Sequence, residues 1–325
     1  MKKIFSLTLG LLLTICWANA QTVSQEIEFK TGRAAGNFAE KKMKKAPKKL
    51  YINRFNVNFQ LIYIDSEQTR EGVYHGATSS TLTVGFEGVP QADLQAITDE
   101  LYSNYITKME AAGYEILTAD DASGIKEFEE YTRMSGGKMS EVQKLGYGTI
   151  TPTGFDYYVK RLGKDGKEKG IDKSHKVSQQ LGAVVVNVDL DVPFMVESES
   201  GASKLATGIV GGVSKVVASP YLRVDQSSNI KYHFEAQSYL NIPLKKNINI
   251  SGVFKDEKFK AVAGAEANSS YSMGYHTIVV SNDVDAKTVQ VAECDANKYI
   301  AGVKEAATLY LDKSTDSFLG YAAGK

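Results

Sequence analysis

The chain has 325 residues, of which 43% are hydrophobic, and it carries 38 basic and 38 acidic side chains. This length accommodates one large domain or two ordinary ones, and the apolar fraction is sufficient for a real core. Surfaces that bind nucleic acid or anionic lipid generally carry a basic excess, so the balanced charge argues against both kinds of partner.

Residues 1–20 predict a secretory signal peptide. Lys2 and Lys3 precede an apolar run over residues 4–17, and Ala18-Asn19-Ala20 is a small-x-small cleavage signal. An uncleaved membrane anchor would need ~20 consecutive apolar residues, more than this run contains. We therefore expect export, cleavage after Ala20, and a periplasmic or outer-membrane-associated protein.

The two cysteines have different predicted fates. Cys16 suggests a lipoprotein, but the residue before a lipidated cysteine is normally small, and here it is Ile15. Cleavage after Ala20 would remove Cys16 and leave Cys294 alone, so no intrachain disulfide is possible. A nucleophilic cysteine needs a positioned histidine and a third group, and no histidine is placed to serve it. We predict that Cys294 is a small buried hydrophobe.

Residues 21–48 predict an exposed, lysine-rich lead-in, which reaches into the run KKMKKAPKK. The segment offers few large apolar residues for insertion into a membrane surface, so we favour a solvated linker. The folded domain is expected over residues 49–325.

The first strand is predicted over residues 50–65, where apolar and polar residues alternate. The apolar series is Phe55, Val57, Phe59, Leu61 and Tyr63, and the polar series is Arg54, Asn56, Asn58 and Gln60. A shorter strand is expected over 80–87, an amphipathic helix over 90–112 and a short strand in YEILTADD. The apolar face of the helix, from Leu94 to Met109, would cover the apolar stripe of the first strand.

Residues 118–180 form an irregular insertion in the prediction. DDASGIKEFEEYTRM is expected to be helical, and glycine-punctuated, charged stretches follow it. Such a segment either carries a partner contact, as loops often do, or is a tolerated insertion, and the sequence leaves both open.

The strongest strand signal is GAVVVNVDLDVPFMV, over 182–196, which follows a helix-like KVSQQL. The first residues of this stretch are all apolar, and Asn187, Asp189 and Asp191 then alternate with apolar residues. This pattern predicts a strand that is buried on both faces at its start and has one polar face at its end. A hairpin is expected over 231–254, and whether its apolar side meets a core or lipid is open. A further strand over 271–281 and a helix from Asp295 to Leu311, capped by Asp295, complete the elements.

These elements predict an α+β fold with α/β-like character: a mixed, largely antiparallel sheet with amphipathic helices packed on it, plus a β-hairpin region. Their order resembles the periplasmic domain shared by the curli-secretion channel protein, the lipoprotein activators of penicillin-binding proteins and the N-terminal domain of TolB. The residues that carry the resemblance are Leu94 to Gly113, Tyr114 to Leu117 and Leu181 to Leu190. The resemblance implies a domain that works through protein contacts at the envelope, and it transfers no site residues.

No motif identifies a chemistry. GIVGGVSK places Ser214 before Lys215, the reverse of a phosphate loop. Asp189 and Asp191 on one strand face would suit a metal or an acid–base pair, but a solvated face is the preferred interpretation because no further ligand is placed beside them. The histidines at 75, 175, 233 and 276 form no ligand motif. We therefore assign no catalytic residue, no metal ligand and no cofactor.

Three functions remain as hypotheses. The favoured one is an exported, non-catalytic envelope protein that contacts other envelope or outer-membrane proteins in assembly, secretion or wall maintenance, as a homo-oligomer if it self-associates. The second is an exported hydrolase or ligand-binding protein that uses Asp189 and Asp191. The third is an outer-membrane pore subunit built from amphipathic hairpins such as 231–254.

Overall fold

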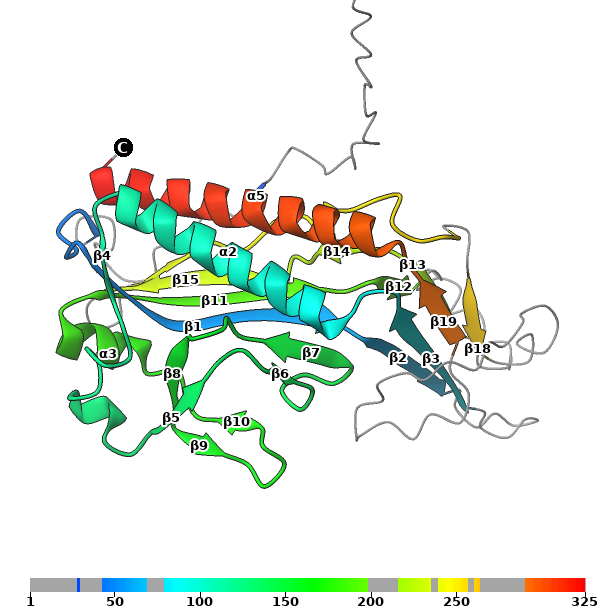
Figure 1. Ribbon diagram of the computed structural model, residues 1–325, viewed down its shortest axis with the longest axis horizontal. Helices are drawn as coiled ribbons and strands as arrows, with labels where there is room; N and C mark the ends of the chain where they lie inside the picture. The colour runs from blue at the N-terminus through cyan, green and yellow to red at the C-terminus, as the bar shows by residue number, and fades with distance from the viewer. Residues whose placement is uncertain are drawn as a thin grey trace, which may run out of the picture.

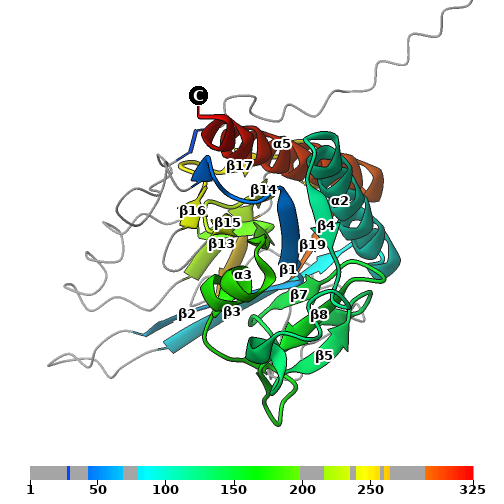
Figure 2. The same cartoon turned by 90° about the vertical axis from the view of Figure 1, so that its left-hand side faces the viewer.

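The structure is a computed structural model that describes residues 28–29, 43–68, 79–197, 216–234, 239–256, 260–263 and 290–324. Its elements form three layers (Figures 1 and 2): two long helices, a central mixed sheet, and a layer of short elements drawn from residues 118–181. The predicted α+β class, with a mixed and mostly antiparallel set of strands, is confirmed. The predicted strand over 271–281 and most of the glycine-rich stretch over 201–220 lie outside the described residues.

The central sheet is built around β1 and β11, which pair in parallel. In spatial order its strands are β16 (Tyr239–Asn241), β15 (Asn229–His233), β11 (Val184–Val192), β1 (Lys49–Gln60), β7 (Tyr147–Ile150) and β6 (Met139–Ser140). The short strand β4 (Glu115–Leu117), which confirms the prediction in YEILTADD, pairs in parallel with the start of β1. The sheet therefore includes β6 and β7 from the segment that the sequence marks as an insertion.

One face of this sheet is apolar and is covered by helices α2 (Gln91–Ala111) and α5 (Ala296–Ala323), which run side by side in Figure 1. Phe55 of β1 contacts Tyr102 of α2 edge-on, with ring centroids 5.3 Å apart. Both predicted helices are present. The cap of α5 is also confirmed, because the Asp295 carboxylate accepts a hydrogen bond from the Lys298 backbone N–H at 3.2 Å.

Helix α5 extends twelve residues beyond its predicted end, to Ala323. The extension keeps burying residues at helical spacing, Phe318 among them. Phe318 stacks on Tyr232 of β15, with centroids 4.1 Å apart and an interplanar angle of 6°. The Tyr310 hydroxyl donates to the Ile242 carbonyl at 2.7 Å. The apolar side of the predicted 231–254 hairpin therefore lies against α5, which answers the question that the sequence leaves open.

The predicted strand over 50–65 is two strands. At Leu61 the chain leaves the central sheet, because the Gly146 carbonyl accepts from the N–H groups of both Leu61 and Ile62 while the Leu61 carbonyl accepts from Phe86. The chain continues in a second sheet with order β19 (Gln290–Glu293), β3 (Ser79–Glu87) and β2 (Ile62–Gln68).

The predicted strand over 182–196 also divides, at Pro193, which has no N–H for a ladder. Its remainder is β12 (Met195–Glu197), which pairs with β13 (Val216–Pro220), and β13 pairs with β18 (Ala261–Ala263). The short strands β14 (Arg223–Val224) and β17 (Ile248–Asn249) pair with each other beneath α5.

The helix predicted from DDASGIKEFEEYTRM is wrong. The chain there forms turns, a single 3₁₀ turn η1 (Lys126–Phe128) and then strand β5 (Thr132–Ser135). Side chains hold this path: the Asp121 carboxylate accepts from the Thr118 N–H at 2.8 Å, a turn bond that competes with helix. Strand β5 pairs with β8 (Asp156–Val159), and β9 (Arg161–Leu162) pairs with β10 (Glu168–Lys169).

The predicted helix in KVSQQL is α3 (Ser174–Leu181), which ends at Gly182 in the left-handed conformation. Parts of the predicted exposed lead-in are also described. Lys44, Lys45 and Lys48 are exposed, whereas Met43 is buried because it joins the main core. Further upstream, Glu28 pairs with Lys245 and Lys246, and these two lysines lower the pKa of Glu28 to about 2.

Candidate functional site

The second face of the central sheet is polar. Residues Arg54, Asn56 and Asn58 of β1 lie in register with Asn187, Asp189 and Asp191 of β11, each opposite its counterpart. The rows continue into the neighbouring strands, with Lys231 and Asn229 of β15 beside Asn187 and Asp189, and with Thr149 of β7 beside Asn58. The two polar series that the sequence predicts separately are therefore one continuous surface, which we call the polar face.

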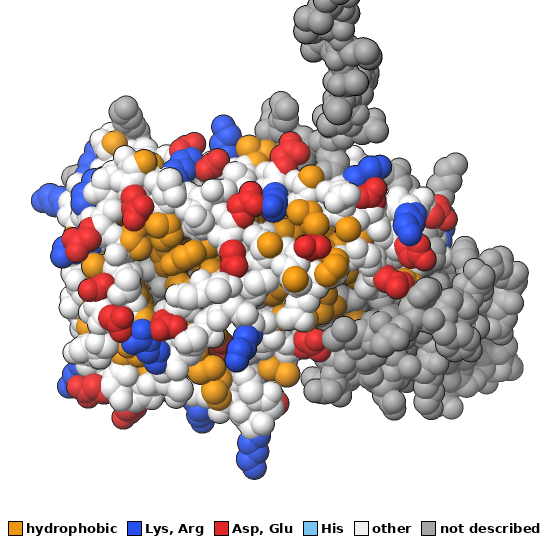
Figure 3. Space-filling view, viewed as in Figure 1, with side chains coloured by type: hydrophobic (Ala, Val, Ile, Leu, Met, Phe, Trp, Pro, Cys, Tyr) orange, Lys and Arg blue, Asp and Glu red, His pale blue; other side chains and the backbone are white. Residues whose placement is uncertain are grey.

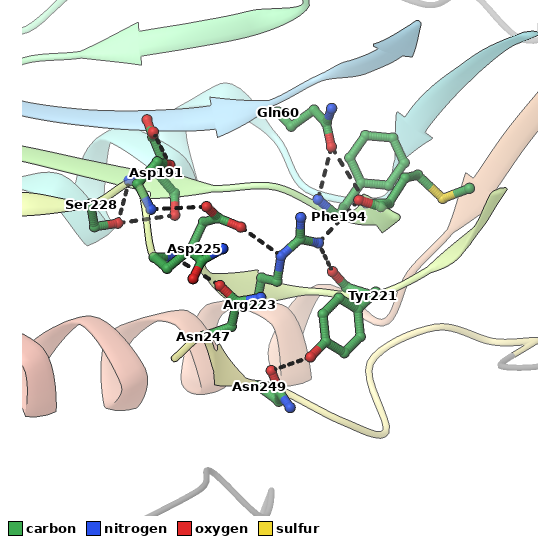
Figure 4. Close-up of polar contacts among 12 residues, drawn as sticks. Gln60, Asp191, Phe194, Tyr221, Arg223, Asp225, Ser228, Asn247 and Asn249 are labelled. Atoms are coloured by element: carbon green, nitrogen blue, oxygen red, sulfur yellow. Dashed lines mark hydrogen bonds and ion pairs between the residues drawn. The ribbon is translucent and has the colours of Figure 1, made fainter. Parts of the chain in front are cut away.

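One end of the polar face is closed by a hydrogen-bonded network around Asp191 (Figure 4). The Asp191 carboxylate accepts from Asn58 at 2.9 Å and from the Ser227 hydroxyl at 2.5 Å, and it pairs with Lys144 at 2.8 Å. The side chain is buried, and the Ser228 hydroxyl accepts from the Asp191 N–H. Asp191 is thus fully engaged in fastening β11 to its neighbours.

The same network continues through Arg223 and Gln60 (Figure 4). Arg223 donates to the Asp225 carboxylate at 2.8 Å and to the carbonyls of Met195 and Tyr221. The side-chain amide oxygen of Gln60 accepts from the backbone N–H groups of Phe194 and Met195, which follow Pro193. These bonds satisfy backbone groups where β11 stops, so this polar cluster serves the fold.

Asp189 is placed differently from Asp191. Its nearest cation is Arg54, at 3.5 Å. The side chains of Arg54 and Asp189 are 47% and 37% exposed to solvent. Burial raises the pKa of Asp189, and it outweighs the opposing effect of Arg54. The two aspartates that the sequence suggests as a pair therefore do not share one site: Asp191 is held in a hydrogen-bonded network, and Asp189 is paired with Arg54, which lines a cleft.

The cleft has a volume of about 110 Å³ and lies between the polar face and the layer formed by residues 118–181. Its floor is Asn53, Arg54 and Asn56 of β1. Its walls come from β8, from the loop over 168–173 and from α3. Aromatic side chains dominate the walls, and they are Phe128, Tyr131, Phe155, Tyr157 and Tyr158.

The floor is fixed by hydrogen bonds that leave polar groups available. The side-chain amide nitrogen of Asn53 donates to the side-chain oxygen of Asn187 at 2.8 Å. The side-chain nitrogen of Asn187 donates in turn to the Ser174 hydroxyl at 2.8 Å. Arg54 lies in the field of Asp189, Glu168 and Asp172, and these carboxylates outweigh burial and raise the pKa of Arg54. The guanidinium is thus held on the floor as a compensated charge.

Beyond α3 the polar face carries His233, which is buried. Its Nε2 lies 3.6 Å from the Asp172 carboxylate and has no hydrogen-bond partner. Burial lowers the pKa of His233 to about 4 and outweighs the attraction of Asp172, so the imidazole is neutral near pH 7. His175 lies on α3, and His75 and His276 are outside the described residues.

Cys294 is buried, as predicted, and burial raises its pKa to about 12. Its N–H donates to the Glu87 carbonyl at 3.1 Å where β19 ends. The nearby Gly88 has φ +119°, and a Cβ there would lie 2.7 Å from the Cys294 carbonyl oxygen. Such packing leaves a thiol with little thiolate character and little room for a substrate.

The aromatic walls are the part of the site that sequence reasoning missed. Phe128, Tyr157 and Tyr158 come from a stretch that the sequence marks as irregular. The available signal is the run FDYYV over residues 155–159, whose aromatic and β-branched residues favour a strand.

The described ranges contain no group of three or more His, Cys, Asp and Glu side chains placed to hold a metal ion. In the same part of the chain, no helix has the length and hydropathy needed to cross a membrane. Fold and site thus define an α+β protein with a polar sheet face and an aromatic-walled cleft. No family model, curated protein or solved structure matches the chain.

Proposed function

We propose that this protein is an exported, non-catalytic cell-envelope protein that acts by contacting other envelope proteins. The observation that carries the proposal is a group of exposed apolar side chains on the layer formed by residues 118–181. Leu145, Leu162 and Ile171 are 61%, 39% and 76% exposed. Single exposed leucines are ordinary, but three around one short hairpin mark a contact surface.

The three residues, which we call the hairpin patch, lie in the β9–β10 hairpin or in segments next to it. Leu162 lies in β9 and Ile171 follows β10 by two residues. Gln143, two residues before Leu145, donates to the Gly166 carbonyl at the hairpin turn and accepts from the Glu168 N–H. The patch is therefore a fixed feature of this layer.

The hairpin patch is bordered by positive charge. Residues 160–173 contain six basic and three acidic side chains. Basic side chains project from the molecular edge that carries β9 and β10, whereas the surface over α2 shows apolar groups among charges of both signs (Figures 1 and 3). An apolar centre with a basic rim fits a protein partner with an acidic border.

Each group considered for catalysis has another role, which supports a function by binding. Asp191 accepts three bonds from neighbouring side chains, Cys294 is a buried thiol, and Asp189 faces Arg54. The alternative of a pore subunit depended on an apolar stripe over 231–254. In the described part of that range, Tyr232, Leu240 and Ile242 are buried in the core beside α5.

Site-specific photocrosslinking tests this function. A photoreactive residue replaces Leu162 or Ile171 in the full chain, and in a matched control it replaces Thr107, which is exposed on α2. We expect both hairpin variants in the envelope fraction to give the same discrete adducts and Thr107 to give none. Retention of the chain in the cytosol, or equal labelling at Thr107 and Ile171, would contradict the proposal.

A further inference from the structure

The cleft combines an aromatic wall with a polar floor. Phe128 stacks on Tyr158 with centroids 4.3 Å apart, and Phe155 stacks on Tyr157 at 5.7 Å with an interplanar angle of 11°. Tyr157 and Tyr158 are only half-buried, so part of each side chain stays open. Aromatic faces carry partial negative charge and attract the C–H bonds of a ligand that lies against them.

The floor presents hydrogen-bonding capacity that the protein does not use. The Asn53 amide nitrogen is bonded to Asn187, which leaves its carbonyl oxygen as an acceptor. A guanidinium has five N–H donors, and within the described part of the chain Arg54 donates to the side chain of Asp189, at 3.5 Å. A ligand that fits must therefore donate to one floor group and accept from another, as hydroxyl groups do.

The charge on the floor of the cleft is compensated. Arg54 is compensated by Asp189, Glu168 and Asp172, and the Tyr157 hydroxyl donates to Glu168 at 2.8 Å. Lys160, Lys169 and Lys173 also line the cleft and give its lining more basic than acidic side chains. Lys160 and Lys169 are exposed, and water and salt screen exposed charges. Neither an anion nor a cation would find an uncompensated opposite charge on the floor, which favours a neutral ligand.

The size of the cleft limits how much of a ligand it takes. Its volume of about 110 Å³ is close to that of the ~150 Å³ engineered cavity that accepts benzene. One six-membered ring is thus the unit that enters, with the remainder of a longer ligand outside.

We propose that this cleft binds one ring of a neutral carbohydrate. The C–H face of the ring lies against the Tyr157 and Tyr158 side of the cleft, and its hydroxyls exchange hydrogen bonds with Asn53, Arg54 and Asn56. An apolar side chain of a peptide would leave the floor groups unpaired, at a cost in affinity. This site is separate from the hairpin patch, so either proposal can fail without the other.

Binding is measured on the full mature chain by saturation-transfer NMR and calorimetry. The probes are neutral trisaccharides of glucose, galactose, mannose and N-acetylglucosamine, with the trimer of galacturonic acid as an anionic comparison and uridine and adenosine as flat-ring comparisons. We expect saturation transfer to the ring protons of at least one neutral trisaccharide, and weaker or no transfer to the anionic trimer and the nucleosides.

Four variants connect the binding to the cleft. Arg54→Met and Tyr157→Leu should each weaken binding at least tenfold, whereas Tyr157→Phe, which keeps the ring, should stay within about threefold. Arg161→Met is the matched control, since Arg161 is exposed on β9 and does not line the cleft. Thermal unfolding of each variant shows that the fold is retained.

Three results would overturn the proposal. They are the absence of transfer to all four neutral trisaccharides, tighter binding of a nucleoside or of the anionic trimer, and binding that Arg54→Met and Tyr157→Leu leave unchanged.

Discussion

The buried imidazole of His233 makes the stability of the protein sensitive to mild acid. Its side chain is buried beside Asp172, Lys231 and His175, and burial lowers its pKa to about 4 from the ordinary 6.5. The folded state therefore binds fewer protons than the unfolded chain between these two values. The stability associated with neutral His233 is fully present above pH 6.5 and is lost as the pH falls toward 4.

The size of the effect follows from the two pKa values. Between pH 7 and pH 5 the preferential protonation of unfolded His233 lowers the free energy of unfolding by about 2 kcal/mol. The carboxylates with raised pKa, Asp189 and Glu141, act in the opposite direction. A comparison with a variant that lacks only the imidazole removes their contribution.

The assay is urea unfolding, followed by circular dichroism at pH 7 and pH 5, of residues 21–325 with the wild-type sequence and with His233→Gln. Glutamine stays polar but does not titrate in this range. We expect the wild type to lose about 2 kcal/mol more than the variant on this change of pH. Equal losses would show that His233 is protonated in the folded state, and the burial argument would be wrong.

Three further predictions concern the core and the polar network. Asp191→Ala should lower the free energy of unfolding by about 2–4 kcal/mol because it leaves buried donors and a cation unpaired. Asp189→Ala should cost less than about 1 kcal/mol, because the partners of Asp189 are a half-exposed Arg54 at 3.5 Å and Asn56. Similar costs in urea unfolding would contradict this ranking. Phe318→Ala should cost about 3–5 kcal/mol because it removes the ring stacked on Tyr232, and calorimetry showing an unchanged melting temperature would refute that packing. In a protein of residues 21–325, Cys294 should resist a thiol reagent at pH 8 until urea unfolds the protein, and rapid labelling of the native chain would rule out its burial.

The local sequence predicts helices well where a proline or a capping side chain sets the end of the helix. Helix α2 follows Pro90 and α5 begins at an Asp295 cap, and these two signals predict both helices. Helix α3, which is expected from KVSQQL, ends at Gly182. The helix expected over 120–134 fails because Thr118, Asp120 and Asp121 form turns, with Arg133 holding Asp120 in place. Short polar side chains that bond backbone groups outweigh weak helical periodicity there.

Strand ends were predicted less well because they depend on partners. The alternation of apolar and polar residues continues through Leu61 and does not show that the chain changes sheets there. The change depends on the Gly146 carbonyl, which accepts from the Leu61 N–H and lies 85 residues further along the chain. Pro193 is a readable break, but the parallel pairing of β1 with β11 is not readable in either strand.

The sequence by itself determined the α+β class, the three helices, the burial of Cys294 and the existence of two strands with polar sides. Each depends on interactions over a few residues or on the period of hydrophobicity. Only the tertiary structure decided that the polar sides of β1 and β11 form one surface, that Asp191 and Asp189 belong to different environments, and that the aromatic residues of 128–158 wall a cleft above Arg54. These features depend on contacts between residues from 36 to 135 positions apart, and a sequence pattern contains no distance information on that scale.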